Sequence, residues 1–294
     1  MLAWFRRRRR HRILEDPFPE ALRKALHRDA ALWRVLSDEE RRRLEDDLRV
    51  FMAERTWEPC GGLDLTQERK ALIAALACVL TLGRSVDAFG HVRTILVYPD
   101  RYMAPEAEED DLGVVTESLE DREGEAWERG QVVLSWADLR QDARNLNGRN
   151  LVLHEFAHQL DLLDFLAAAR PVDAGERDTH ARWARVLTQT HALLNELDQK
   201  GRRDPVLDTY GAEDASETFA VATEAFFERP RRLGQFHPDL YRVLSEYYNQ
   251  DPAARMEQES GGTGERGQET VQIKAKDVKK KSRRKSAKVR DFNK

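Results

Sequence analysis

Cysteine is scarce in this 294-residue chain, which contains only Cys60 and Cys78. One pair of thiols is too small a framework to stabilise a chain of this length, so a disulfide-rich secreted domain is excluded. Neither cysteine has another cysteine or a histidine at the spacing of metal ligands, which argues against a cysteine-based metal site. We therefore expect two reduced, structural thiols in a reducing compartment.

Long hydrophobic runs are also missing. The longest apolar stretch, residues 71–82, has twelve residues, whereas a membrane-spanning helix needs about 20. The arginine-rich residues 6–12 are followed by Ile13-Leu14-Glu15-Asp16-Pro17 and not by the apolar segment of a signal peptide. These absences predict a soluble, cytoplasmic protein with no membrane span.

Charge of both signs is abundant but unevenly distributed. The formal net charge is −4, yet residues 274–294 carry +9 and residues 6–12 carry +6, which leaves −19 between them. Because blocks of like charge commonly stay disordered, we expect a basic disordered arm over residues 1–16 and a disordered lysine- and arginine-rich tail over residues 256–294. Phe292 is the only aromatic residue of that tail. The tail therefore predicts only weak, non-specific contact with nucleic acid.

Between these ends, the composition predicts one globular domain over residues 17–255. Apolar residues make up 40% of the chain, which is ordinary for a folded protein. Ser37 and Glu40 have the spacing of a capping box that opens a helix. A second helix is predicted to begin at Thr66 and to end before Gly83.

Two segments rich in valine, isoleucine and leucine, residues 91–98 and 131–136, read as strands. They are followed by helical patterns, among them an apolar helix over residues 216–227. The order of helices, a small sheet and a second group of helices predicts an α+β fold that is mostly helical.

The stretch His154-Glu155-Phe156-Ala157-His158 contains the residues best suited to catalysis. In a helix, residues four apart lie on one face, so the two imidazoles can reach one metal ion. Glu155 would project beside that ion, where the general base for a bound water molecule belongs. The alternative interpretation is a helix that carries two unrelated histidines.

A catalytic zinc site uses three protein ligands and an open position for water. A third histidine ten residues after His154 is excluded, because Asp164 stands there. Asp164 is itself a second candidate, yet Asp161 occupies the place of the glycine that would turn the chain back. Glu217, 59 residues after His158 at the start of an apolar helix, is the better candidate. A carboxylate at a helix start is, however, also favoured by the helix macrodipole alone.

Residues 154–161, with Tyr210 and Glu217 seven residues apart, resemble the Mlc titration factor A family of zinc metallopeptidases. The same motifs resemble the catalytic domain of anthrax lethal factor. The resemblance to the titration-factor family extends over roughly residues 17–255 and excludes the arginine-rich arm and the basic tail. Its further blocks occur in the same order, at residues 87–89, 96–99, 133–136, 217–227 and 247–252.

This resemblance implies a zincin-like fold with a glutamate as the third ligand. It implies one Zn²⁺ per chain, bound by His154, His158 and Glu217. Glu155 would act as general base and then as general acid, and Tyr210 would donate a hydrogen bond to the oxyanion. The implied activity is hydrolysis of a peptide or protein substrate, mainly as an aminopeptidase.

Two further carboxylates lie at helical spacing from these residues. Asp161 follows His158 by one turn, so it can accept the free imidazole N–H and hold the ring in place. A solvated carboxylate on the same helix is the alternative. Glu224 follows Glu217 by two turns and can face the same cavity, but the sequence assigns it no role.

A binding protein is the competing class of function. The resemblance also implies an interaction with Mlc, a glucose-responsive transcriptional repressor of sugar uptake, which such a protein would sequester from DNA. In that case the metal site would be secondary to the regulatory contact. The sequence shows no surface for such a partner.

Overall fold

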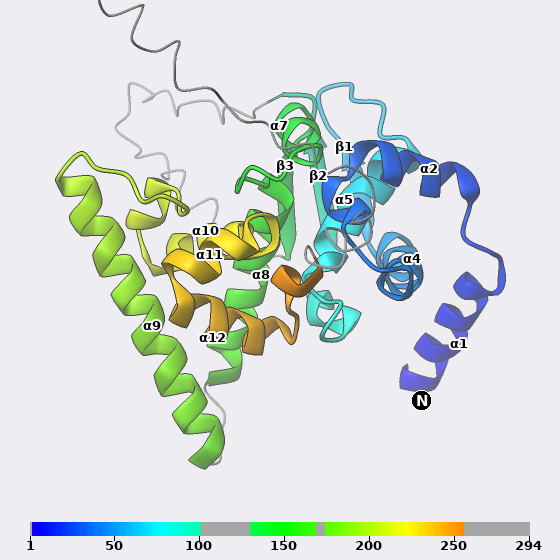
Figure 1. The fold of residues 1–294 in the computed structure, drawn as a ribbon. Coiled ribbons are helices and arrows are strands. Elements are labelled where there is room, and N and C mark those ends of the chain that lie inside the picture. The colour runs from blue at the N-terminus through cyan, green and yellow to red at the C-terminus, as the bar shows by residue number, and fades with distance from the viewer. Residues whose placement is uncertain (1, 101–129, 169–173, 256–294) are drawn as a thin grey trace, which may run out of the picture. The chain divides into compact units, whose positions relative to one another are not determined.

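The computed structural model describes residues 2–100, 130–168 and 174–255 (Figure 1). The predicted tail over residues 256–294 lies outside these residues. The helices are α1 (Leu2–Glu15), α2 (Glu20–Asp29), α3 (Ala31–Arg34), α4 (Asp38–Glu54), α5 (Gln67–Val79), η1 (Val86–Phe89), α7 (Trp136–Asp142), α8 (Leu151–Ala168), α9 (Ala174–Gln199), η2 (Thr209–Ala212), α10 (Ala215–Glu228), α11 (Pro230–Phe236) and α12 (Pro238–Tyr248). Three short strands complete the described part, so its helical character and small sheet agree with the α+β class expected from the sequence.

Helix α5 is buried around its whole circumference, which explains the apolar run in the sequence. Residues 71–79 are all buried, and α5 packs against α4 and α2. Thr66 caps its first turn by accepting a hydrogen bond from the backbone N–H of Arg69 at 3.3 Å. At the other end, the side chain of Gln250 donates to the carbonyl of Val79 at 3.0 Å. The helix predicted from Thr66 is therefore confirmed.

The capping box at the start of α4 is also confirmed. The backbone N–H of Glu40 donates to Ser37 Oγ, and the Glu40 carboxylate accepts from the backbone N–H of Ser37 at 2.9 Å. These bonds satisfy two backbone donors that the helix itself leaves without partners. Leu48 and Phe51 further along α4 are fully buried in the core.

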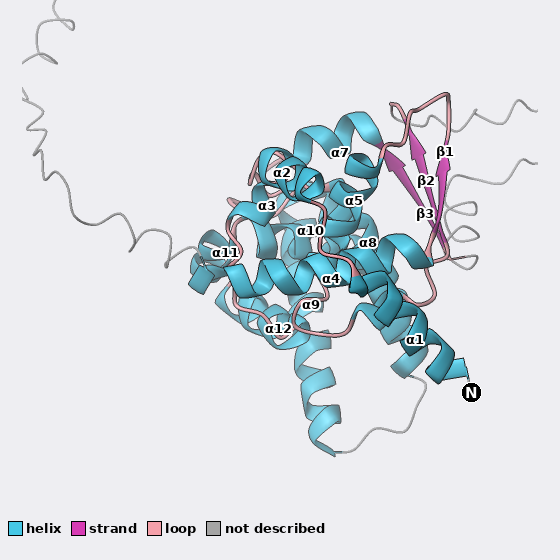
Figure 2. Cartoon of the chain, turned by 90° about the vertical axis from the view of Figure 1, so that its right-hand side faces the viewer, coloured by secondary structure: helices cyan, strands magenta, loops and turns pink. Residues whose placement is uncertain are grey.

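The three strands form one parallel sheet in the order β1 (Thr56–Pro59), β2 (Thr94–Tyr98), β3 (Gln131–Ser135) (Figure 2). The central strand places Ile95 opposite Trp57 on one side and opposite Val132 on the other. Both strands predicted from the sequence are present, with β2 starting at Thr94 rather than at residue 91. Strand β1 was not predicted, because its four residues are mostly exposed and end in a proline.

Residues 2–15 form helix α1, in contrast to the disordered arm expected over residues 1–16. Arginine is a good helix former, so the local sequence allows this conformation. Contacts with the rest of the domain offset the repulsion between its arginines. Arg10 Nη2 lies 2.7 Å from a carboxylate oxygen of Glu54 and 2.7 Å from one of Asp87.

The two cysteines and the lengths of the helices can be compared with the expectations from the sequence. Cys60 and Cys78 are both free thiols, and Cys78 is buried. Of the helices in the described residues, none has the length and apolar character required to cross a membrane.

Helices α8 and α10 pack against each other along the middle of the domain and carry the candidate site (Figure 1). The inward residues of α8, among them Leu153, Phe156 and Leu160, are buried. The Phe156 ring contacts Phe51 and Phe89 edge-on, with centroids 5.6 and 4.9 Å away. These contacts fix the rotation of α8, and with it the direction in which its polar residues point.

Candidate metal centre

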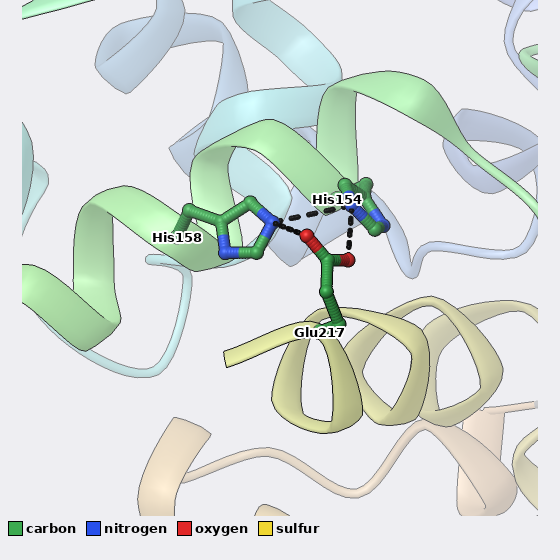
Figure 3. A group of neighbouring side chains, drawn as sticks. All are labelled: His154, His158 and Glu217. Atoms are coloured by element: carbon green, nitrogen blue, oxygen red, sulfur yellow. Dashed lines mark hydrogen bonds and ion pairs between the residues drawn. The ribbon is translucent and has the colours of Figure 1, made fainter. Parts of the chain in front are cut away.

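His154 and His158 on α8 face Glu217 on α10 (Figure 3). One ligand atom from each residue lies within 4.8 Å of those of the other two. His154 and Glu217 are partly buried and His158 is buried. The structure therefore brings together the three residues that the sequence and the family resemblance suggested as metal ligands.

The separations between these atoms have the scale of a metal coordination shell. The two Nε2 atoms are 3.2 Å apart. Glu217 Oε2 lies 3.1 Å from Nε2 of His154, and Oε1 lies 3.3 Å from Nε2 of His158. A tetrahedron with metal–ligand distances of about 2.0 Å has edges of about 3.3 Å. The three side chains thus hold their donor atoms close to this spacing.

Glu217 Oε2 is a buried atom that needs a positive partner. Its nearest nitrogen neighbour is Nε2 of His154, 3.1 Å away, and this contact does not have the geometry of a hydrogen bond, although Oε2 is shielded from solvent. A buried carboxylate oxygen without a hydrogen bond of good geometry is costly unless a positive charge lies beside it. Burial raises the pKa of Glu217, but the two imidazoles outweigh burial and lower that pKa to about 2. The carboxylate is therefore ionised, in the form that binds a cation.

His154 sits between two carboxylates. Burial lowers the pKa of its imidazole, but the carboxylates of Glu217 and Glu224, one beside each ring nitrogen, raise the pKa to about 10. A metal ion binds neutral imidazole and replaces the proton. The two carboxylates around His154 therefore make an environment that favours a cation.

Glu224 binds the side of His154 that faces away from the candidate metal position. Its Oε1 lies 2.9 Å from Nδ1 of His154. Glu224 Oε2 accepts a hydrogen bond from the backbone N–H of Asn150, just before α8 begins. Because a carboxylate accepts the Nδ1 proton, Nε2 of His154 is left free for a metal.

Asn150 and Glu228 stabilise the first turn of α8 through hydrogen bonds. Asn150 Oδ1 caps the helix by accepting from the backbone N–H of Leu153 at 3.2 Å, and its amide donates to Glu228 at 3.0 Å. Glu228 also accepts from the backbone N–H groups of Asn147 and Gly148, at 3.1 and 2.8 Å. The loop before α8 is therefore tied to α10 by buried hydrogen bonds.

Ser216 connects His158 to Asp161. Ser216 Oγ lies 2.9 Å from Nδ1 of His158 and donates to Asp161 Oδ2 at 3.0 Å. The sequence suggested that Asp161 receives the imidazole N–H directly. The structure shows a serine that links the two and that comes from α10, next to Glu217.

Tyr210 lies at the open side of the site on η2. Its ring centroid is 6.0 Å from that of His154, and 47% of the residue is exposed. The turn is fixed by Asp208, which accepts from the backbone N–H of Tyr210 at 3.1 Å, and by Thr218, which donates to the carbonyl of Gly211 at 2.7 Å. A ring in this position can reach a molecule bound at the histidines.

Glu155 follows His154 directly on α8 and is partly buried. Its negative charge contributes to the raised pKa of His154, after the larger effects of Glu217 and Glu224. Asp164, the alternative third ligand, has a side chain outside the described part. Helix α8 continues without a break to Ala168, so the chain reversal that an Asp164 ligand needs does not occur.

Sequence reasoning did not find the roles of Glu224 and Ser216. Glu224 lies seven residues after Glu217, a spacing that places both on one face of α10. That periodicity was the only available signal, and it does not say which histidine lies opposite. Ser216 had no signal of its own, because a serine beside a helix start is usually explained by capping.

The ionised carboxylate of Glu217, the two facing imidazoles and the spacing of their donor atoms together define a candidate metal centre of the kind found in metallopeptidases. The pattern of one known family, described as glucose-regulated metallo-peptidase M90, matches residues 3–249. The chain belongs to this metallopeptidase family.

Several relatives are similar over most of their length. The chain is 35% identical over 222 residues to Mlc titration factor A of Pectobacterium atrosepticum, which covers 75% of the chain and 83% of that relative. Mlc titration factor A of Serratia proteamaculans is 33% identical over 229 residues, covering 76% and 84%. A protein of Synechocystis sp., slr2042, is 34% identical over 247 residues, covering 83% and 89%.

Proposed function

We propose that this protein is a zinc-dependent peptidase with a zincin-like fold, and that His154, His158 and Glu217 hold one Zn²⁺ per chain. The observation that carries the proposal is the convergence of two imidazole nitrogens and a partly buried carboxylate, with Nε2 of His154 and Nε2 of His158 at 3.1 and 3.3 Å from the two oxygens of Glu217. Two histidines and one glutamate are a ligand set of catalytic zinc, which leaves one position for water. Membership of a metallopeptidase family supports the same reading.

The roles of the surrounding residues follow from where they lie. When bound, zinc acts as a Lewis acid and lowers the pKa of a water molecule to about 7. Glu155 takes a proton from the attacking water and passes it to the nitrogen of the leaving amine. Tyr210, from its place on η2, donates its O–H to the oxyanion of the tetrahedral intermediate. Glu224 holds the Nδ1 proton of His154 and so fixes the orientation of that ring.

We further propose that a peptide with a free amino terminus is the preferred substrate. A cavity of about 460 Å³ opens beside Tyr210 and is lined by Asp198, Asp208 and Glu213, with Arg149 as its one basic residue. A positively charged terminal amine would be more favourable there than a neutral peptide backbone. This charge balance supports an aminopeptidase over an endopeptidase.

Metal content and hydrolysis test the proposal. We expect about one zinc per chain in the wild type and a loss of zinc in Glu217→Ala, with the control Glu246→Ala, an exposed glutamate on α12, unchanged. The zinc-loaded wild type should cleave aminoacyl substrates faster than internally quenched, amino-blocked peptides. Equal zinc content in Glu217→Ala would remove this residue from the site, and a preference for blocked peptides would overturn the aminopeptidase reading.

A repressor-binding protein is the second candidate, because two of the relatives carry the name Mlc titration factor A. By analogy, this chain would bind a transcriptional repressor and remove it from DNA. The variant Glu155→Gln separates the two functions. A protein that acts by sequestration should still release a repressor from its operator when Glu155 is replaced, whereas an effect that depends on peptide cleavage should disappear.

A further inference from the structure

Helix α1 is fixed to the domain along one face. Arg10 lies 2.7 Å from both Glu54 and Asp87, and Arg6 lies 3.2 Å from Asp87. Arg9 donates to the carbonyl of Ala53 at the end of α4, at 2.9 Å. Figure 2 shows α1 beside α4. The orientation of the helix, and hence of its opposite face, is therefore set by specific contacts.

The opposite face combines aromatic rings with arginines for which the described part of the chain supplies no counter-charge. Trp4, Arg8 and Arg12 are spaced by four residues and so share one side of the helix, with Phe5 next to Trp4. Trp4 and Phe5 are 55% and 59% exposed, the two highest values among the large hydrophobic residues of the described part. Within the described residues, Arg8 and Arg12 form no ion pair.

The charge of this helix is of a single sign over most of its length. Residues 2–14 contain six arginines and no acidic residue. Among its arginines, Arg6 and Arg10 are the ones paired with carboxylates of the described residues, so the others keep their charge available to a partner. A surface of this kind fits a partner that is negatively charged at its boundary and apolar just beneath it.

We propose that the outward face of α1 binds the surface of an anionic lipid bilayer. The arginines would lie among acidic headgroups, and Trp4 and Phe5 would enter the boundary between headgroups and acyl chains, where aromatic rings are favoured. Electrostatic attraction and insertion of apolar groups act together here, and stable attachment to a membrane surface requires two such signals.

The arrangement of the rings argues against nucleic acid as the partner. The Arg8 guanidinium lies over the Trp4 ring, 5.3 Å from its centroid, and covers a face on which a base would stack. Phe5 meets Trp4 edge-on at an interplanar angle of 81°, so the two rings do not form a flat stacking platform. Glu15, the last residue of α1, and Asp16 directly after it are acidic and would repel an extended phosphate backbone.

Sedimentation of the full-length protein with lipid vesicles tests this proposal. One set of vesicles contains phosphatidylcholine alone. The other contains about 30% phosphatidylglycerol and so represents an anionic membrane. We expect binding to the anionic vesicles only. Trp4→Ser with Phe5→Ser, and separately Arg8→Glu with Arg12→Glu, should each weaken partitioning about tenfold or more.

The matched control is Arg231→Glu with Arg242→Glu, which makes the same charge change at exposed positions on α11 and α12. It should bind like the wild type, and circular dichroism should show that all variants are folded. Absence of vesicle binding by the wild type would overturn the proposal. Undiminished binding by both α1 variants would also overturn it, since another part of the chain would then be responsible. A third outcome is that the aromatic variant still binds vesicles while the arginine variant does not, and that the protein binds duplex DNA as tightly as vesicles. The arginines would then be a non-specific polyanion-binding surface, and the proposal would be overturned.

Discussion

Nδ1 of His154 and Oε1 of Glu224 lie 2.9 Å apart in the buried space between α8 and α10. The histidine belongs to the motif that is visible in the sequence, and the glutamate belongs to a helix that begins 61 residues later, at Ala215. This pair determines which nitrogen of His154 carries the proton, and thus which one is available to a metal. The second helix therefore contributes a ligand through Glu217 and the orientation of another ligand through Glu224.

Replacing Glu224 by glutamine should weaken zinc binding by about 10- to 100-fold, because the neutral amide holds the imidazole N–H less strongly. Competition with a chromogenic chelator measures the affinity. The control Glu246→Gln on the surface of α12 should have no effect. Zinc affinity equal to that of the wild type would show that Glu224 does not orient His154. Thermal unfolding without zinc separates this effect from a general loss of stability.

Tyr210→Phe should lower kcat about 10²-fold or more, since one donor to the oxyanion is lost. Zinc affinity and thermal stability should stay the same, because the ring is half-exposed and its hydroxyl is not part of the expected ligand set. Steady-state kinetics on an aminoacyl substrate provides the measurement. A change confined to KM would instead assign Tyr210 to substrate binding.

Asp161 and Ser216 should act as one unit on His158. We expect Ser216→Ala to weaken zinc binding, and we expect Asp161→Ala to have little additional effect once Ser216 is absent. The double-mutant cycle over both positions measures this coupling. Strictly additive losses of zinc affinity would mean that Asp161 acts on the site by a route other than the serine.

Glu228 should make stability depend on pH. Burial raises the pKa of its carboxyl from 4.5 to about 8, although hydrogen bonds from Asn150 and from backbone N–H groups lower it. The folded state therefore keeps a proton that the unfolded state releases, so the contribution of Glu228 to stability is complete below about pH 4.5 and declines as the pH rises to about 8.

The variant Glu228→Gln carries no titrating group and should not show this decline. The free energy of unfolding of Glu228→Gln should therefore rise relative to that of the wild type between about pH 4.5 and 8, and the difference should stay constant above that range. Urea unfolding at several pH values gives the comparison. Curves for the two proteins that run parallel over the whole range would contradict the raised pKa.

Local patterns were sufficient where the responsible residues are close in sequence. The capping box of Ser37 and Glu40, the helix that begins at Thr66 and the shared face of His154 and His158 all depend on spacings of three or four residues. The two longer strands were visible from their branched apolar residues. These features could be predicted because neighbouring residues alone determine them.

Features that depend on tertiary packing were not accessible in the same way. Helix α1 looked like a disordered arm because Glu54 and Asp87, which pair with its arginines, are distant in sequence. The residues of β1 have little intrinsic preference for a strand, and they form one because they pair with the edge of β2. Glu217 was suggested by a helix start and a family resemblance, whereas Ser216 and Glu224 became meaningful only once α8 and α10 were in contact.

Hydrolysis by zinc-loaded wild type and by zinc-loaded Glu155→Gln tests the central claim most directly, with aminoacyl and internally quenched peptides as substrates. Zinc content should be equal in both proteins, because Glu155 is not among the expected ligands. We expect measurable hydrolysis by the wild type and its loss in the variant, since the proton of the attacking water then has no acceptor. Equal rates for the two proteins at equal zinc content would contradict the role of Glu155 as general base and would leave the metal centre without a role in peptide hydrolysis.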